Sequence, residues 1–275
     1  MFFASILIVL YKKKPFESET FKSLQKCKHL LRGCCVTYIW DNSPELLSSD
    51  EEKDLIENNE ELAIQYLSKS GNTSLSEIYN HIIKLCRRDS LLVILDHDTS
   101  FNEAYIAEIL KATESSENSD INLFLPLIIS CNKIFSPSFE YFKLRSVLWK
   151  YPRVGRMSVK NMQAINSGMV IRTDYLKDAF PGYDEHLKFY VTDLDFMYKY
   201  RSQNKDVYVL DTRLNHILNF YEEDNASKAR RFKEQRASNL YLSKKQSVLL
   251  YFLQCLRYIY VTIRFCLKYR TRSFL

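Results

Sequence analysis

The most constraining feature of the sequence is a run of five aliphatic residues that ends in two carboxylates. Residues 91–95 read LLVIL, and Asp96-His97-Asp98 follows directly. An unbroken run of branched aliphatic side chains is typical of a strand buried on both faces of a parallel sheet. Because open α/β sheets bind ligands beyond the carboxyl ends of their strands, we expect Asp96 and Asp98 to lie at a binding site.

Two carboxylates held close together need a compensating charge, because the burial of an isolated anion is costly. A hard divalent cation such as Mg²⁺ or Mn²⁺ prefers carboxylate oxygens and is often shared with a substrate phosphate. The sequence has 5 glycines and contains neither a GxGxxG nor a GxxxxGK[ST] loop. It therefore predicts a phosphate site built from a metal ion and side chains.

Strand-like and helix-like segments alternate along the first hundred residues. The predicted strands are 5–11, 35–40, 63–67 and 91–95, and the predicted helices are 15–31 and 74–88. This alternation is typical of βαβ units and a mostly parallel sheet. Three strands end in polar residues, at Tyr11, Asp41 and Asp96, and right-handed crossovers would bring those ends to one edge of the sheet.

The second half of the chain is less regular. The predicted segments are strands at 122–129, 164–172 and 206–211, a helix at 192–202, and a basic, loop-like stretch at 143–160. We find neither an internal repeat nor a low-complexity linker. We therefore expect one α/β domain over residues 1–220 and a C-terminal helical extension over residues 221–275.

Composition bears on the cellular setting. The seven cysteines are odd in number and lack the CxxC spacing of metal sites, which favours a reduced, cytoplasmic environment. The apolar N-terminal run is followed, not preceded, by lysines 12–14, so it predicts a buried first strand rather than a signal peptide. The net charge of +6 suits nucleic acid, anionic lipid or phosphorylated ligands equally well.

Residues 247–269 are almost wholly apolar or aromatic. On a helix, Arg257, Arg264 and Lys268 share one narrow sector beside an apolar one. A central arginine makes a membrane span costly, by about 2.5–3.5 kcal/mol on insertion scales. We expect an amphipathic helix that lies in the membrane interface. A helix packed on the domain or in a dimer seam is the alternative.

Several short motifs occur in order between residues 5 and 216. They are the first strand, Asp41-Asn42-Ser43, residues 72–80, LDHDTS at 95–100, Asn166-Ser167-Gly168, PGYDE at 181–185 and TDLDF at 192–196. In this order they resemble a family-2 glycosyltransferase of the GT-A fold, especially the bacterial rhamnosyltransferase-like branch. Thr192 departs from the family pattern, which has an acidic residue before Asp193.

The resemblance implies a Rossmann-like α/β fold and an inverting, metal-dependent transfer of a sugar from a nucleoside-diphosphate donor. It implies that Tyr11 and Asp41 contact the base and that Asp96 contacts the ribose. Asp98 would ligate Mn²⁺ or Mg²⁺, which stabilises the charge of the leaving nucleoside diphosphate. His216 would be a further metal ligand or a contact to the diphosphate.

Asp193 is the predicted catalytic base, because an inverting transfer needs a carboxylate that takes the proton of the attacking hydroxyl. Arg153, Arg156, Ser167 and Gly168 would lie near the donor or acceptor phosphates. The implied acceptor is a glycan, lipid-linked, in surface polysaccharide synthesis at the inner face of the cell membrane. No nucleic-acid partner is implied.

Two other functions fit parts of the pattern. Residues 94–99 also match the DxDxT motif of haloacid-dehalogenase-like phosphatases, in which Asp96 would be the nucleophile and Asp98 the acid and base. That motif normally opens its domain, whereas about ninety residues precede it here. The third possibility is an inactive transferase-like subunit that binds membranes.

The acidic residues also have purely structural interpretations. Paired aspartates at a strand end often form a turn or cap a helix, and carboxylates in the first turn of a helix, such as Asp193, favour the macrodipole. Asp41 precedes a segment that invites an Asx-turn. His216 alone is a weak signal for a ligand.

Overall fold

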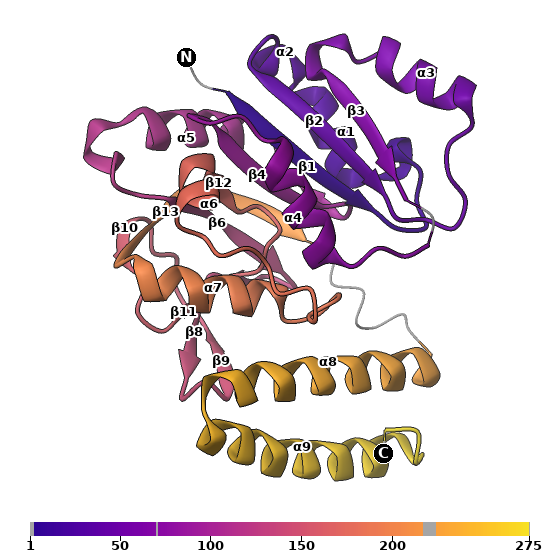
Figure 1. Ribbon diagram of the computed structural model, residues 1–275, viewed down its shortest axis with the longest axis vertical. Helices are drawn as coiled ribbons and strands as arrows, with labels where there is room; N and C mark the ends of the chain where they lie inside the picture. The colour runs from indigo at the N-terminus through magenta and orange to yellow at the C-terminus, as the bar shows by residue number, and fades with distance from the viewer. Residues whose placement is uncertain (1–2, 70, 217–223, 275) are drawn as a thin grey trace.

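A mixed sheet runs through the middle of the computed structural model, which describes residues 3–69, 71–216 and 224–274 (Figure 1). In these residues the ten-stranded sheet has the order β10-β13-β6-β12-β4-β1-β2-β3, with β5 paired to β13 and β7 to β6. Its strands are β1 (Ala4–Leu10), β2 (Cys35–Asp41), β3 (Ile64–Ser68), β4 (Leu91–Asp96), β5 (Thr99–Ser100), β6 (Leu123–Ser130), β7 (Lys133–Ser136), β10 (Gly155–Ser158), β12 (Val170–Arg172) and β13 (Asp206–His216).

Strands β3, β2, β1 and β4 are parallel, and their register aligns their carboxyl ends. Val9 pairs with both Trp40 and Asp96, and Leu10 pairs with Asp41. The prediction that the polar ends of these strands meet at one edge of the sheet is therefore confirmed. β12 is antiparallel to both of its neighbours, β4 and β6, which makes the sheet mixed.

Helices cover both faces of the sheet (Figure 1). On β1, Ile6 and Ile8 belong to the core under one set of helices, and Leu7 and Val9 belong to the core under the other. The first set is α1 (Glu19–Lys26), α2 (Lys28–Leu31), α3 (Ser49–Glu57) and α5 (Glu103–Glu114); the second is α4 (Leu75–Leu85), α6 (Thr173–Asp178) and α7 (Thr192–Gln203). The short 3₁₀ helices are η1 (Pro15–Glu17), η2 (Glu60–Leu62) and η3 (Ser116–Asn118).

A small second sheet and a helical hairpin complete the chain. The sheet has the order β11-β8-β9 and consists of β8 (Ser138–Tyr141), β9 (Arg145–Leu148) and β11 (Met162–Gln163). The hairpin consists of α8 (Asn225–Gln246) and α9 (Val248–Tyr269), which lie side by side below α7 and β9 (Figure 1). The predicted boundary between residues 220 and 221 lies outside the described residues.

The expected α/β fold, with its mixed, mostly parallel sheet flanked by helices, is confirmed. The predicted helix at 15–31 is divided into η1, α1 and α2, and the predicted strand at 164–172 is reduced to β12. Residues 143–160 are not only loop, because β9 and β10 lie there. All four side chains of β9 are exposed, so its sequence lacks the apolar alternation by which strands are recognised.

Gly168 lies where the chain turns into β12. Its φ is +83°, and a Cβ atom there would lie 2.7 Å from Cγ of Pro126 on β6. Its N–H donates to the carbonyl of Ile94 at 2.7 Å. Only glycine combines this backbone conformation with so close an approach to β6.

We expect Gly168→Ala to lower the free energy of unfolding by about 2–5 kcal/mol, because left-handed backbone and an overpacked Cβ both oppose alanine. Gly33→Ala is the matched control, since Gly33 has φ +72° but no atom within 4 Å of the position that its Cβ would take. Denaturant unfolding of both variants measures the difference. Equal destabilisation of the two would show that the contact with Pro126 contributes nothing.

Candidate active site

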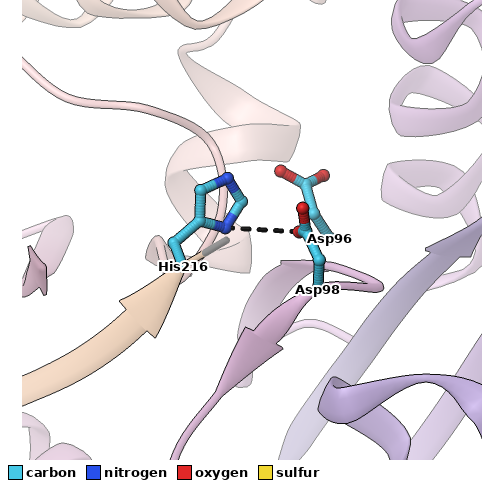
Figure 2. Close-up of side chains that lie close together, drawn as sticks. All are labelled: Asp96, Asp98 and His216. Carbon is cyan, nitrogen blue, oxygen red and sulfur yellow. Dashed lines mark ion pairs between the residues drawn. The ribbon is translucent and has the colours of Figure 1, made fainter. Parts of the chain in front are cut away.

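Asp96, Asp98 and His216 lie together at one edge of the sheet (Figure 2). Asp96 ends β4, Asp98 follows in the turn to β5, and His216 ends β13, where it pairs with Thr99. One ligand atom from each of the three side chains lies within 4.8 Å of the others. Nδ1 of His216 is 3.3 Å from Oδ1 of Asp98. Residues about 120 positions apart in the sequence thus form one cluster.

The turn that carries the two aspartates is held by hydroxyl groups. The N–H of Asp96 donates to Oγ of Ser167 at 3.0 Å, and Ser167 Oγ lies 2.8 Å from Thr99 Oγ1. Thr99 Oγ1 lies 2.9 Å from Nδ1 of His216. Oγ1 of Thr20 accepts the N–H of Thr99 at 3.0 Å and donates to the carbonyl of Thr99 at 2.8 Å. Ser167 therefore links the backbone of Asp96 to Thr99 and, through Thr99, to His216.

The cluster fits a divalent cation. Oδ1 of Asp98 is buried and accepts no hydrogen bond from the described residues. Desolvation raises the pKa of Asp96 to about 6, and the neighbouring Asp98 adds to the rise. Two carboxylates and an imidazole form a donor set that suits Mn²⁺, and the carboxylates also suit Mg²⁺.

Asp193 faces the same cavity from the first turn of α7. Val191, at the N-cap, has φ +70°, a conformation that β-branched residues rarely adopt, and α7 begins immediately after it. The second acid of this segment, Asp195, is paired with Lys199 at 2.5 Å, whereas Asp193 lines the cavity. Desolvation raises the pKa of Asp193 to about 6. Asp193 is thus the better placed of the two acids to act as a base.

The cavity has a volume of about 520 Å³. Asp96, His216 and Asp193 line it from the main domain. The other walls come from the small sheet and from the helical hairpin, which contribute Arg145 and Arg257 among others. The C-terminal hairpin is therefore part of the wall of the site.

Tyr11 and Asp41 lie at the same edge of the sheet, but neither lines this cavity among the described residues. Tyr11 is exposed. Asp41 is buried, and its carboxylate accepts the hydroxyl of Tyr66 at 2.5 Å and the N–H of Ser43 at 2.9 Å. The bond from Ser43 is the Asx-turn that the sequence suggested.

Arg156 is far from the cluster. It pairs with Asp120 and with Asp206, each at 2.8 Å. Asp206 begins β13 and His216 ends it, so about 30 Å of strand separates them. This placement argues against the expected position near the donor or acceptor phosphates, because two carboxylates hold the guanidinium at the other end of the strand.

None of the remaining predicted phosphate contacts, Arg153, Ser167 and Gly168, lines the cavity among the described residues. The guanidinium of Arg153 lies 5.3 Å from the ring centre of Phe139. Ser167 and Gly168 are buried behind the cluster. Thr20 and Thr99 hold the turn and were not predicted; Thr99 follows the acidic motif directly, but Thr20 is about eighty residues away from it and gives no local signal.

No protein-family model matches the sequence, and no curated protein matches it significantly. Solved structures do match. One is TarS 1-349 of S. aureus, with TM-score 0.56 and 14% identity over 86% of this chain and 65% of that one. Another is GalNAc-T7 with UDP, GalNAc and Mn²⁺, with TM-score 0.63 and 13% identity over 99% of this chain and 55% of that one.

A third match is the mannosyltransferase PcManGT from Pyrobaculum calidifontis, in complex with GDP-Man and Mn²⁺. Its TM-score is 0.56 and its identity 10%, over 88% of this chain and 64% of that one. The fold is that of a GT-A glycosyltransferase. This chain spans between about half and two thirds of the length of these three structures.

Within this GT-A fold, the cluster lies at a topological switch point. From β1 the parallel strands continue to β2 and β3 on one side, and β4 lies on the other. Ligands of open α/β sheets bind in the crevice at such a point. The two aspartates at the end of β4 thus stand where the architecture itself provides a binding crevice.

We expect Asp96→Asn to raise the stability of the metal-free protein at neutral pH, by on the order of 2 kcal/mol. A pKa of about 6 in the folded state lies above the unfolded value, so ionised Asp96 opposes folding. The gain over wild type should shrink as the pH falls from 7 toward 4, because the folded wild-type protein then takes up the proton. Thermal melts in chelator at both pH values measure this difference.

Asp178→Asn is the control for that experiment. Asp178 is exposed, and its hydrogen bond with Arg88 holds its pKa below the ordinary range, so its replacement should not stabilise the protein. A loss of stability in Asp96→Asn would contradict the electrostatic origin of the effect.

Proposed function

We propose that the protein is a metal-dependent glycosyltransferase that moves a sugar from a nucleoside-diphosphate donor to a hydroxyl group of a glycan. One observation carries the proposal: Asp96, His216 and Asp193 line one cavity, with Asp98 beside them, at the switch point of a GT-A fold. Two structurally similar proteins support the donor class, since one is complexed with UDP and the other with GDP-Man, each with Mn²⁺.

Asp98 and His216 would ligate the metal, Mn²⁺ or Mg²⁺, and Asp96 would contact the ribose from the adjacent position. The bound cation supplies positive charge against the leaving nucleoside diphosphate. Thr99 and Ser167 hold His216 and the turn in place, so little rearrangement is needed on binding.

Asp193 would take the proton of the acceptor hydroxyl, which an inverting displacement requires. Asp195, the other acid of the TDLDF segment, is not available for this role because it forms an ion pair with Lys199. Thr192 accepts a hydrogen bond from Asn166 at 3.0 Å, so the residue that departs from the family pattern serves to fix the start of α7.

Tyr11 and Asp41 remain proposed contacts to the base, at the ends of β1 and β2. Any base contact of Asp41 would compete with Tyr66, whose hydroxyl donates to Oδ2. Tyr11 has no such restriction, because its ring is exposed at the edge of the sheet.

The proposed acceptor is a lipid-linked glycan in polysaccharide synthesis, and the proposed transferred sugar is of the rhamnosyl or hexosyl type. The proposed location of the protein is the inner face of the cell membrane. α9 is long and apolar enough to cross a bilayer, with a mean hydropathy of 1.3, but one such helix is weak support for a span. Its buried face packs on α8 and includes Gln254 and Thr262. An interfacial position suits this arrangement better than a span.

We expect one nucleoside diphosphate to raise the melting temperature by several degrees when Mn²⁺ is present, and not otherwise. A ligand at 100 times its dissociation constant adds about 2.7 kcal/mol of stability, which for a chain of this size is a shift of several degrees. Thermal melts with UDP, GDP, dTDP and CMP, with and without Mn²⁺, name the donor class.

The shift should disappear in Asp98→Ala and persist in Asp211→Ala, which removes an exposed carboxylate from the same strand as His216. Flat curves with every nucleotide, together with hydrolysis of a simple phosphate ester, would favour the phosphatase. Flat curves with neither activity would favour the inactive subunit.

At saturating Mn²⁺, we expect kcat/KM to fall about tenfold per pH unit below about pH 6, the pKa of Asp193. The base acts only as a carboxylate. Because the pKa of Asp193 is raised, activity should fall at a pH about two units higher than it would with an ordinary aspartate as the base. Asp193→Asn should lower kcat by about 10²–10⁴-fold and leave the nucleotide-dependent melting shift intact. Full activity of Asp193→Asn would assign the base to another residue.

A further inference from the structure

Three cations line the wall of the cavity that the C-terminal hairpin helps to form. They are Lys143 and Arg145, beside and on β9, and Arg257 on α9. None of them has a carboxylate within 4.0 Å in the described part of the chain. By contrast, carboxylates pair with Arg156 and Arg201 elsewhere in the fold. The ammonium of Lys143 donates to Oε1 of Gln246 at 2.6 Å, so the guanidinium groups of Arg145 and Arg257 are the two cations of the wall that remain open to an anion.

Gln254 fixes the guanidinium of Arg257 and the backbone of Lys143. It is only 3% exposed; its Nε2 donates to the carbonyl of Lys143 at 3.1 Å, and its Oε1 accepts from Arg257 at 3.1 Å. A guanidinium has five N–H donors, so the bond to Gln254 leaves Arg257 with others for a ligand. A buried polar side chain therefore fixes Arg257 in the wall, and Arg145 lines the same cavity from β9 as an exposed side chain.

An exposed apolar surface borders this wall on α9. Its large exposed side chains include Leu249, Phe252, Leu253, Leu256, Tyr260, Ile263 and Leu267. At 100° per residue, Arg257, Arg264 and Lys268 fall between this surface and the buried face of the helix. The anion site and the apolar surface are thus adjacent on one helix.

The charge of the hairpin points to an anionic surface as the cover of this apolar face. Residues 221–275 contain twelve lysines and arginines against four aspartates and glutamates, and the rest of the chain is slightly acidic. Basic residues beside an exposed apolar helix face match the headgroup level of an anionic bilayer. A second copy of this segment would bring like charge to the same surface, so it complements the hairpin less well than an anionic bilayer does.

We propose that Arg145 and Arg257 bind the phosphate of a lipid-linked acceptor, whose hydrocarbon chain extends along the apolar face of α9 into the bilayer. The inference rests on the proposed transferase function and deepens it by giving the acceptor its own anion site. The donor diphosphate belongs to the metal cluster at the ends of β4 and β13. A ligand that needs both a cationic pocket and an adjoining apolar surface carries a phosphate and an alkyl chain.

Equilibrium binding of decyl phosphate to the full chain, without nucleotide or metal, tests the proposal. We expect it to bind at least about tenfold more tightly than inorganic phosphate or decanol, because only decyl phosphate fills both parts of the site. Arg145→Gln combined with Arg257→Gln should weaken binding at least about tenfold. The single variant Arg257→Lys keeps the positive charge and Arg145, so it should bind decyl phosphate nearly as tightly as wild type.

Arg264→Gln is the matched control, because Arg264 is exposed on the same flank of α9 but lies outside the cavity lining. An equal loss in Arg264→Gln would reduce the effect to general attraction by a basic helix and overturn the proposal. Equal binding of inorganic and decyl phosphate would overturn its lipid part.

Two further measurements separate this proposal from the transferase function. Vesicles that contain phosphatidylglycerol should bind the double variant within about twofold of wild type, because the apolar face and the other cations remain. Loss of vesicle binding would make the two arginines membrane contacts rather than a pocket. If the double variant loses the Mn²⁺-dependent rise in melting temperature with nucleotide, the two arginines bind the donor rather than the acceptor. If wild type lacks that rise, the transferase function itself is refuted.

Discussion

The repulsion between Asp96 and Asp98 is the interaction on which the rest of the site depends. Two carboxylates at the end of a buried strand stay together only if the surrounding chain fixes them, and here three hydroxyl groups fix the turn that carries them. Gly168 lets the chain pass close to β6 immediately beside Ser167. His216 comes from the far end of the domain sequence to complete the cluster.

The hairpin is tied to the domain through a motif of the fold itself. Asp184, in the PGYDE segment, accepts the hydroxyl of Tyr241 at 3.0 Å and an ion pair from Lys245 at 2.6 Å, both on α8. These bonds hold the pKa of Asp184 well below its usual range, although partial burial alone would raise it. Thus one turn of the domain anchors the helices that wall the cavity.

The sequence was most informative where buried strands and polar strand ends coincide. The aliphatic run before Asp96 predicted β4, and the alternation of segments predicted the parallel strands whose ends bring Asp41 and Asp96 to one edge of the sheet. Contacts between side chains far apart in the sequence could not be predicted. No local pattern indicates that Asp120 and Asp206 form ion pairs with Arg156, or that the hydroxyl of Tyr66 donates to Asp41. The wall of the cavity was missed because β9 is short and exposed.

The exposed apolar face of α9 also has a consequence for the protein in solution. Soluble monomers seldom leave a contiguous apolar surface of this extent in water, and such surfaces promote self-association. A small core between the two helices, formed by Ala229, Phe232, Tyr258 and Phe274, stabilises the hairpin. The apolar face of α9 therefore stays exposed. Away from a bilayer, the fold therefore favours aggregates held together by α9, and detergent would keep it dispersed by covering the same side chains.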